Sequence, residues 1–311
     1  MNNNSVSDHV PTIIVAGGTG HLGGLIINHL IKQKARVRAL VRSTSGHNKS
    51  HELEAKGVEV MKVDFSNHAE LVEVCKGAQC IVSAVSGLED VIIGLQTNLL
   101  RAAIEAGVPR FIPSDYSIDF TKLPEGSNRN LDLRRQFMHI IDNSSIQATS
   151  VLNGMFTNLL AKEAPVVNFK GKKIMYWGDE DQLLDFTTID NTAEYTAHAA
   201  MDPTTPRFLY IAGSVMSMRQ IREAASKVTG KEFRMFRVGG LGMLKTMITI
   251  TRTLVPQKKK VFPPWQGMQY LHNMLTGLPK FTQLNNQRYP GVRWTSVDEV
   301  LAKAVRSALE V

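Results

Sequence analysis

The feature that most constrains this chain is a glycine-rich segment near the amino terminus, Gly17-Gly-Thr-Gly20-His-Leu-Gly23. A short β-branched run, 12–16, precedes it, and apolar residues at helical spacing follow it up to Gln33. Glycines between a strand and a helix allow a tight turn and a close approach of the backbone to a pyrophosphate. The helix N-terminus adds unpaired N–H groups and a positive dipole end. The segment therefore predicts a phosphate-binding turn, with cofactor contacts from Gly17, Thr19, Gly20, His21, Leu22 and Gly23.

Strands and helices alternate after this turn. Further strands are expected at 37–41, 58–63, 79–83, 110–113 and 148–152, and further helices at 69–75, 91–106 and 131–141. Strands separated by helices imply right-handed βαβ crossovers and a sheet covered on both faces. The expected fold class is therefore α/β, with a Rossmann-type doubly wound parallel sheet.

The alternation ends near Asn153. Short strands are expected at 173–176 and 207–212, and helices at 217–228 and 296–307. A methionine-rich stretch, 240–278, predicts either helices that wall a flexible apolar pocket or methionines that fill gaps in a core. We expect three parts: a polar leader at 1–10, a nucleotide-binding Rossmann domain at 11–153, and a smaller C-terminal α+β lobe at 154–311. The lobe would mainly bind substrate, and its strands and a helix can return to the Rossmann sheet.

The residue that ends the second strand selects between two dinucleotides. An NAD site presents Asp or Glu to the ribose hydroxyls at this point, whereas this chain has Arg42, nineteen residues past Gly23. A guanidinium pairs with a 2′-phosphate through two charge-assisted hydrogen bonds, so we expect NADPH/NADP as cofactor. Further donors around that phosphate are expected from Ser43, Thr44 and Lys49, with a solvated surface lysine as the alternative for Lys49. Position along the sheet places the adenine and ribose beside Asp64, Phe65, Ala84, Val85 and Ser86.

Composition and charge exclude several other classes. With 43% apolar and 21% charged residues, the chain is neither disordered nor of low complexity. The formal charge of +8 is dispersed, with one short run at 258–260 and no recognisable reader motif, so no nucleic-acid partner is expected. No apolar run approaches the roughly 18 residues needed to span a bilayer, so no membrane partner is expected either.

The cysteines and histidines also bear on the expected class. Cys75 and Cys80 have neither the number nor the spacing of a disulfide framework or a zinc pair, and are expected to be buried thiols in a reducing compartment. The nine histidines show no pair at metal-ligand spacing with nearby carboxylates, so no metal is expected. A cytoplasmic protein is therefore expected.

Six segments, taken in order, resemble the NmrA-like, isoflavone-reductase-like branch of atypical short-chain dehydrogenases: AGGTGHLGG, ALVRSTS, GVEVMKVDF, SAVSG, LLRAAIEAGVPRFIPSDYS and QRYPGVRWTSVDEV. The resemblance covers nearly the whole chain. It implies a Rossmann domain that binds NADPH, a smaller C-terminal substrate domain and a cleft between them. Relatives of this kind include reductases of aromatic compounds and quinones, and also catalytically silent regulators that sense NADP(H).

The chain lacks the catalytic residues of classical short-chain dehydrogenases, and it also departs from the pattern of the isoflavone-reductase-like enzymes. None of the six tyrosines has a lysine four residues later, which excludes the Tyr-xxx-Lys pair of classical short-chain dehydrogenases. In the isoflavone-reductase-like enzymes, a lysine early in the helix after the fifth strand is general acid or base. Arg134 falls on that position, or Arg135 if the alignment slips by one residue. Arginine is a poor proton shuttle but can stabilise an oxyanion, so we expect Arg134 to be the electrophile and Tyr116 the proton donor.

Two of these site residues have ordinary alternatives. Arg134 would otherwise be an exposed helix cation that pairs with Asp132 or solvent. Phe156 matches a family position that borders the nicotinamide ring, and its alternative is a core phenylalanine.

The sequence thus predicts an NADPH-dependent reductase that transfers hydride to a small aromatic or carbonyl/quinone-type substrate. The alternative is an NmrA-like NADP(H)-binding regulator that senses redox state, with little or no catalysis and a regulatory protein partner. A homodimer is compatible with either function.

Overall fold

A six-stranded parallel sheet forms the centre of the protein. The computed structural model describes residues 10–43, 47–162 and 166–309. The strand order is β3-β2-β1-β4-β5-β6, which reverses between β1 and β4 as in doubly wound folds. The predicted α/β Rossmann-type class is confirmed. The strands are β1 (Thr12–Ala16), β2 (Arg36–Arg42), β3 (Glu59–Val63), β4 (Cys80–Ser83), β5 (Arg110–Ile112) and β6 (Gln147–Ala148).

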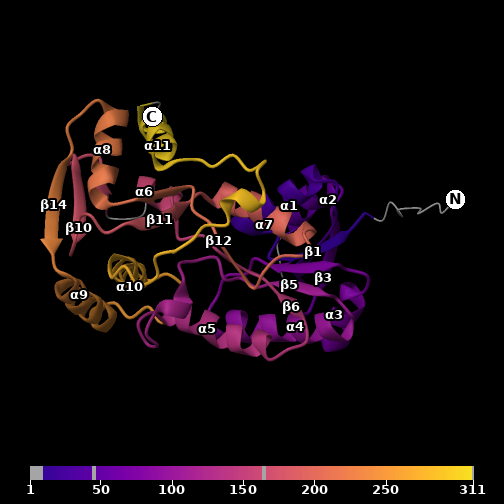
Figure 1. Cartoon of the computed structure of the whole chain (residues 1–311). Helices are drawn as coiled ribbons and strands as arrows, with labels where there is room; N and C mark the ends of the chain where they lie inside the picture. Colours follow the sequence, from indigo (N-terminus) through magenta and orange to yellow (C-terminus); the bar gives the residue numbers. More distant parts are fainter. Residues whose placement is uncertain (1–9, 44–46, 163–165, 310–311) are drawn as a thin grey trace.

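Helices cover both faces of this sheet (Figure 1). One face packs against α1 (His21–Lys32) and α7 (Ile189–Met201), and the other against α3 (His68–Cys75), α4 (Gln96–Glu105) and α5 (Arg129–Asp142). The strands are buried on both faces, which explains their continuous apolar runs. α2 (His47–Glu54) lies near the turn after β2 and was not predicted, because its sequence is almost entirely polar.

The helix predicted over 91–106 is interrupted. Its first part, Asp90–Leu95, is a π-helix, and α4 begins only at Gln96. The buried Gln96 side chain donates from Nε2 to Ile92 O at 2.8 Å and accepts at Oε1 from Ser114 N at 3.0 Å. A side chain bonded into the helical ladder accounts for such a local change of winding. The wider turn therefore faces the end of β5, where Ser114 lies.

The sixth predicted strand, 148–152, also divides into two. β6 ends at Ala148, and β7 (Ser150–Leu152) pairs in parallel with β12 (Phe208–Tyr210) instead of extending the main sheet. Thr149 lies at the break, where its hydroxyl bonds to Thr205 Oγ1 at 2.7 Å. Together with α7, which packs on α1, β12 brings chain from beyond residue 153 back to the Rossmann half.

The remaining elements form a second lobe with its own hydrophobic core (Figure 1). Two three-stranded sheets, β14-β10-β9 and β13-β11-β8, lie among its helices. The strands are β8 (Met155–Phe156), β9 (Val167–Asn168), β10 (Lys173–Trp177), β11 (Leu184–Thr187), β13 (Ser214–Met216) and β14 (Arg234–Gly239). The helices are α6 (Asn158–Lys162), α8 (Met218–Thr229), α9 (Leu241–Leu254), α10 (Pro264–Leu275) and α11 (Val297–Leu309). The predicted elements at 173–176, 217–228 and 296–307 correspond to β10, α8 and α11.

Both cysteines are buried free thiols, as predicted. Burial raises the pKa of Cys75 to about 12 and that of Cys80 to about 11, so neither is a reactive thiolate. Within the described ranges, no helix has the length and hydropathy needed to cross a membrane. No group of three His, Cys, Asp or Glu side chains in those ranges is arranged to hold a metal ion.

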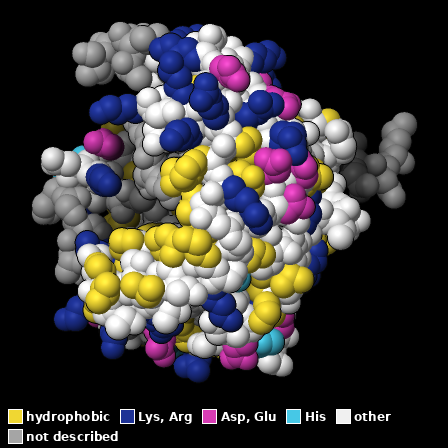
Figure 2. Space-filling model, turned by 90° about the vertical axis from the view of Figure 1, so that its left-hand side faces the viewer, with side chains coloured by type: hydrophobic (Ala, Val, Ile, Leu, Met, Phe, Trp, Pro, Cys, Tyr) yellow, Lys and Arg dark blue, Asp and Glu magenta, His cyan; other side chains and the backbone are white. Residues whose placement is uncertain are grey.

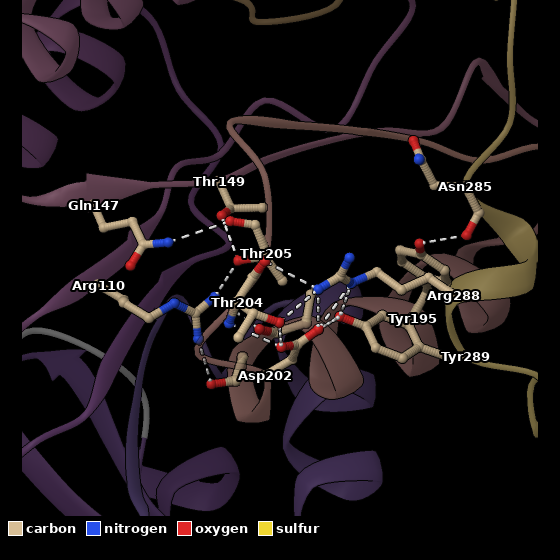
Figure 3. A network of polar contacts seen from close by, with 12 residues as sticks. Arg110, Gln147, Thr149, Tyr195, Asp202, Thr204, Thr205, Asn285, Arg288 and Tyr289 are labelled. Atoms are coloured by element: carbon tan, nitrogen blue, oxygen red, sulfur yellow. Dashed lines mark hydrogen bonds and ion pairs between the residues drawn. The ribbon is translucent and has the colours of Figure 1, made fainter.

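A polar network ties the end of α7 to the segment around 285–289 (Figure 3). Arg110, buried at the start of β5, donates to Ala199 O at 2.9 Å and Ala200 O at 3.1 Å. Asp202 Oδ2 accepts from Arg288 Nε and from Tyr289 Oη, each at 2.8 Å. Burial alone would raise the pKa of Asp202, but hydrogen bonds from Thr204, Tyr289 and Arg288 outweigh it and hold that pKa well below its ordinary range.

This network predicts a pH-dependent contribution to stability. A carboxylate whose pKa is lowered on folding stabilises the protein above its unfolded pKa, near 4, and loses that contribution as the pH falls. Asp202→Asn is expected to cost on the order of 1–2 kcal/mol at neutral pH. In a chain of this length, that cost corresponds to a melting temperature lower by roughly 2–4 °C. Thermal unfolding at pH 7 and pH 3 checks this, because the deficit should shrink at the lower pH. A deficit equal at both values would contradict it.

Candidate functional site

The glycine turn between β1 and α1 is built for close backbone contacts. Gly17 has φ +85°, and a Cβ there would lie 2.6 Å from Ala84 O. A Cβ on Gly23 would lie 2.3 Å from Gly17 O, so this position admits no side chain. Gly20 caps α1 without a side-chain hydrogen bond, and the first turn of α1 contains no acidic residue. The first N–H groups of α1 are therefore available to an anion, as a pyrophosphate requires.

Gly23→Ala is expected to abolish measurable dinucleotide binding, because the new methyl group displaces Gly17 and with it the turn. Gly24→Ala is the matched control, since a Cβ there meets Gly18 O at an ordinary 3.4 Å. Titration of both variants with NADPH by fluorescence, with circular dichroism to verify folding, checks the expectation. Normal binding by a folded Gly23→Ala variant would contradict it.

The other predicted cofactor residues lie around the same edge of the sheet. Arg42 is exposed at the carboxyl end of β2, and within the described residues its guanidinium has no hydrogen-bond or ion-pair partner. Ser43 follows it, and Thr44 lies outside the described residues. Lys49 on α2 is not merely solvated, because its Nζ donates to Thr19 O at 3.0 Å and so joins α2 to the glycine turn. Arg42 and the Lys49 ammonium therefore supply the positive charge at this edge.

The residues predicted for the adenine side follow β3 and β4. Asp64 Oδ1 accepts from Ser66 N at 2.8 Å and Ser66 Oγ at 2.7 Å, and these hydrogen bonds lower the pKa of Asp64. Oδ2 has no hydrogen-bond partner among the described residues. Phe65 is half-buried beside α4, where Asn98 Nδ2 donates to its carbonyl oxygen at 3.1 Å. Ala84, Val85 and Ser86 directly follow β4, and only Ser86 is exposed.

A hydrogen-bonded bridge that sequence reasoning missed joins the carboxyl ends of β4 and β5. Ser114 Oγ donates to Val85 O at 2.6 Å, and Ser114 N donates to the buried Gln96. The two strand ends are thereby held together at the edge that carries the glycine turn. A buried glutamine in an amphipathic helix was the available signal, but its partner is distant in sequence.

Arg134 and Arg135 on α5, the two candidates for the family lysine position, have different environments. Arg135 donates from NH2 to Phe120 O at 2.6 Å and Leu123 O at 2.7 Å, and pairs with Asp132 at 3.1 Å. The guanidinium of Arg135 therefore stabilises the preceding loop. Of the two partners in the alternative for Arg134, Asp132 pairs with Arg135 instead, which leaves solvent.

Arg134 is half-buried and incompletely bonded. NH1 donates to Asn130 O at 3.0 Å, whereas its buried Nε has no partner among the described residues. Burial raises the pKa of Asp115 and that of Tyr270 on α10, and the positive charge of Arg134 opposes both increases. The guanidinium therefore lies near both groups. Asp115 is 1% exposed at the end of β5, and its Oδ2 accepts from Ser150 Oγ at 2.5 Å. Arg134 therefore lies between the sheet edge and the second lobe, and its Nε–H is an unused hydrogen-bond donor.

Tyr116 points away from this position. It is 7% exposed and belongs to the core cluster between the sheet, α1 and α7, with its hydroxyl near Thr196. Burial raises its pKa far above the ordinary value for tyrosine. A proton donor must reach bound substrate, so this placement argues against the role expected for Tyr116. Phe156 on β8 is half-buried and packs against the same cluster from the lobe side.

A cavity of about 1080 Å³ lies between the two halves of the molecule. Its lining begins at Leu88 and Glu89, two and three residues beyond Ser86, and includes Leu133, next to Arg134. The opposite wall comes from α9 and α10, for example Ile248 and Trp265. The cavity is therefore bounded by segments that follow β4 and β5 on one side and by the second lobe on the other.

The methionine-rich stretch forms this wall, but its methionines do not line the cavity. Met274 is buried in the lobe core, and Met247 and Met268 pack against it, so the expectation that they fill core gaps is correct for these residues. α9 presents a separate exposed stripe of Met243, Ile250 and Leu254. Hydrophobic side chains accordingly run across the lower half of the face in Figure 2, at the height of α9 in Figure 1.

These features define a class: a Rossmann-type α/β protein whose second lobe forms one wall of a cavity between the two halves. The model of the NmrA-like family matches residues 10–274. The chain belongs to the NmrA-like family, which confirms the resemblance noted from its motifs.

Similar proteins include named reductases. The chain is 28% identical over 310 residues to the isoflavone reductase homolog IRL of Zea mays, covering 93% of this chain and 96% of that protein. It is 25% identical over 251 residues to the bifunctional pinoresinol-lariciresinol reductase 1 of Linum usitatissimum, covering 76% and 80%. A crystal structure of isoflavone reductase matches with a TM-score of 0.79 at 21% identity, covering 95% of this chain and 99% of that chain. At this identity, the structural match shows the fold.

Proposed function

We propose that this protein is an NADPH-dependent reductase that transfers hydride to a small aromatic or carbonyl-bearing substrate. The observation that carries the proposal is the glycine turn, with a helix N-terminus that has no side-chain cap and with Arg42 at the same sheet edge. The cavity between the two halves, whose lining contains none of these residues, offers the space for a substrate. The relatives named above are reductases, which supports the same reaction class. The division into a nucleotide domain at 11–153 and a mainly substrate-binding lobe at 154–311 is part of this proposal.

The cofactor fits the residues present. The turn from Gly17 to Gly23 would hold the pyrophosphate, and Arg42, with Lys49, would hold the 2′-phosphate. NADPH, when bound, supplies the hydride. Phe156 would exclude water at the lobe side of the cleft.

Arg134 has the chemistry of an oxyanion donor rather than of a proton shuttle. A guanidinium stays protonated near neutral pH, so it offers N–H groups to the negative charge that develops on a reduced carbonyl oxygen. Its unpartnered Nε supports this role. With Tyr116 enclosed in the core, the proton would come from solvent that enters the cavity.

Consumption of NADPH in the presence of quinones, aryl ketones and enones tests the proposal, with the folded Gly23→Ala variant as control. Substrate-dependent oxidation by the wild-type protein alone is the expected result. Binding of NADPH without turnover across the panel would instead favour the second candidate, a regulator that senses redox state. The arginine at the position of the family lysine is the observation that favours that candidate.

A further inference from the structure

The cavity between the two halves is polarised by charge. On the Rossmann side, its lining contains the exposed Glu89 and Glu125, together with Arg129 at the start of α5. On the lobe side, the lining contains Lys245 and Arg252 of α9 and Lys258 of the following loop. Three of the four Lys and Arg residues in the lining therefore lie on the lobe side.

The cations on this wall are close to one another rather than to acids. Burial lowers the pKa of His272, and the nearby charge of Lys245 lowers it further. Burial and the charge of Arg252 lower the pKa of Arg129 in the same way. Among the described residues, no ion pair joins Lys245, Arg252 or Lys258 to a carboxylate. Like charges grouped without partners on a cavity wall attract an anion.

A buried aromatic ring lies beside Arg252. Trp265 is 2% exposed, and its Nε1 donates to Pro256 O at 2.9 Å, so the indole is fixed in place. The guanidinium carbons of Arg129 and Arg252 lie 4.7 and 5.3 Å from the centroid of its ring. Arg129 donates to Lys260 O and Val261 O, which leaves Arg252 as the guanidinium without a hydrogen-bond partner among the described residues.

Apolar side chains also line the cavity. Leu88 and Leu133 line it on the Rossmann side, and Ile248 lines it on the α9 side. An aromatic ring can pack against these side chains while an acidic substituent reaches the cations. The cavity thus combines an apolar path from the reacting end with a positively charged far end.

We propose that the substrate is an aromatic compound that carries an anionic group such as a carboxylate. The anion would lie against Lys245 and Arg252, and the reacting carbon would lie toward Leu133 and Arg134. This inference rests on the proposed function for the identity of the cavity as the substrate pocket.

Calorimetric titration of the protein saturated with NADP+ tests the inference without requiring turnover. The two probes are 2-naphthoate and the neutral 2-naphthamide, which have nearly the same shape. The wild-type protein is expected to bind the naphthoate about tenfold more tightly, and added salt should reduce that preference. Lys245→Gln should weaken the preference, and Lys245→Gln with Arg252→Gln should remove it.

The matched control is Lys231→Gln with Arg234→Gln, which removes the same charge from exposed positions outside the cavity and should keep the preference. Equal affinity for the two probes would overturn the inference, as would a preference that survives in the folded Lys245→Gln, Arg252→Gln variant. Either result would leave a reductase of neutral aromatics intact. A naphthoate preference without NADPH oxidation on any substrate would uphold the anion site and count against the proposed reductase.

Discussion

Arg42→Glu is expected to lower the affinity for NADPH roughly 100-fold while leaving the affinity for NADH unchanged or improved. Arg42 stands where its guanidinium can form two charge-assisted hydrogen bonds with the 2′-phosphate, worth about 3 kcal/mol together. Glutamate removes these bonds, repels the phosphate and can accept from the ribose hydroxyls of NADH. Titration of the wild-type and variant proteins with both cofactors measures the change.

The control for this exchange lies on the same strand. Arg36 is exposed at the amino end of β2, opposite to Arg42, so Arg36→Glu makes the same change of charge far from the cofactor edge. It should bind NADPH as the wild-type protein does. Equal losses in both variants would mean that overall charge, rather than a 2′-phosphate contact, governs the affinity.

Arg134→Gln is expected to lower kcat about 100-fold with little change in the affinity for NADPH, as for removal of one oxyanion donor. Arg134→Lys should retain most of the activity, because it keeps a cationic donor at the position where the resembling enzymes have lysine. Steady-state kinetics with the best substrate of the panel, together with NADPH titration, separate the effect on turnover from the effect on binding.

The neighbouring arginine distinguishes a chemical role from a structural one. Arg135→Gln removes hydrogen bonds to two main-chain carbonyls, so it should lower the melting temperature rather than selectively lower kcat. The assignment of Arg134 would be wrong if Arg134→Gln kept wild-type kcat. It would also be wrong if Arg134→Gln and Arg134→Lys lost activity only in proportion to lost folded protein.

Local patterns predicted the nucleotide half well. The turn from Gly17 to Gly23 and the buried strands on either side of it follow from short-range backbone and hydrophobic rules, and the parallel, doubly wound sheet follows from the crossovers. The π-helix at Asp90–Leu95 and the break at Thr149 were not predictable in this way. Each depends on a hydrogen bond to a distant residue, Ser114 in one case and Thr205 in the other.

The second lobe was harder to predict from the sequence because its features depend on tertiary packing. Helices were expected in 240–278, and α9 and α10 form there, but which residues face the cavity depends on how the helices pack. Lys245, Thr249 and Arg252 recur at helical spacing on α9, so a polar face was visible in the sequence. The position of the Tyr116 side chain was also not predictable, because proximity to the end of β5 does not specify the side of the sheet on which a side chain lies.

The most direct test of the account is hydride transfer itself. The protein is incubated with NADPH carrying deuterium at both C4 positions of the nicotinamide and with the panel of quinones, aryl ketones and enones, and the products are analysed by mass spectrometry. At least one reduced product is expected to carry a single deuterium bound to carbon. For a quinone, the labelled NADPH is expected to be consumed in step with the hydroquinone formed. Tight binding of NADPH with no reduced product from any compound would contradict it.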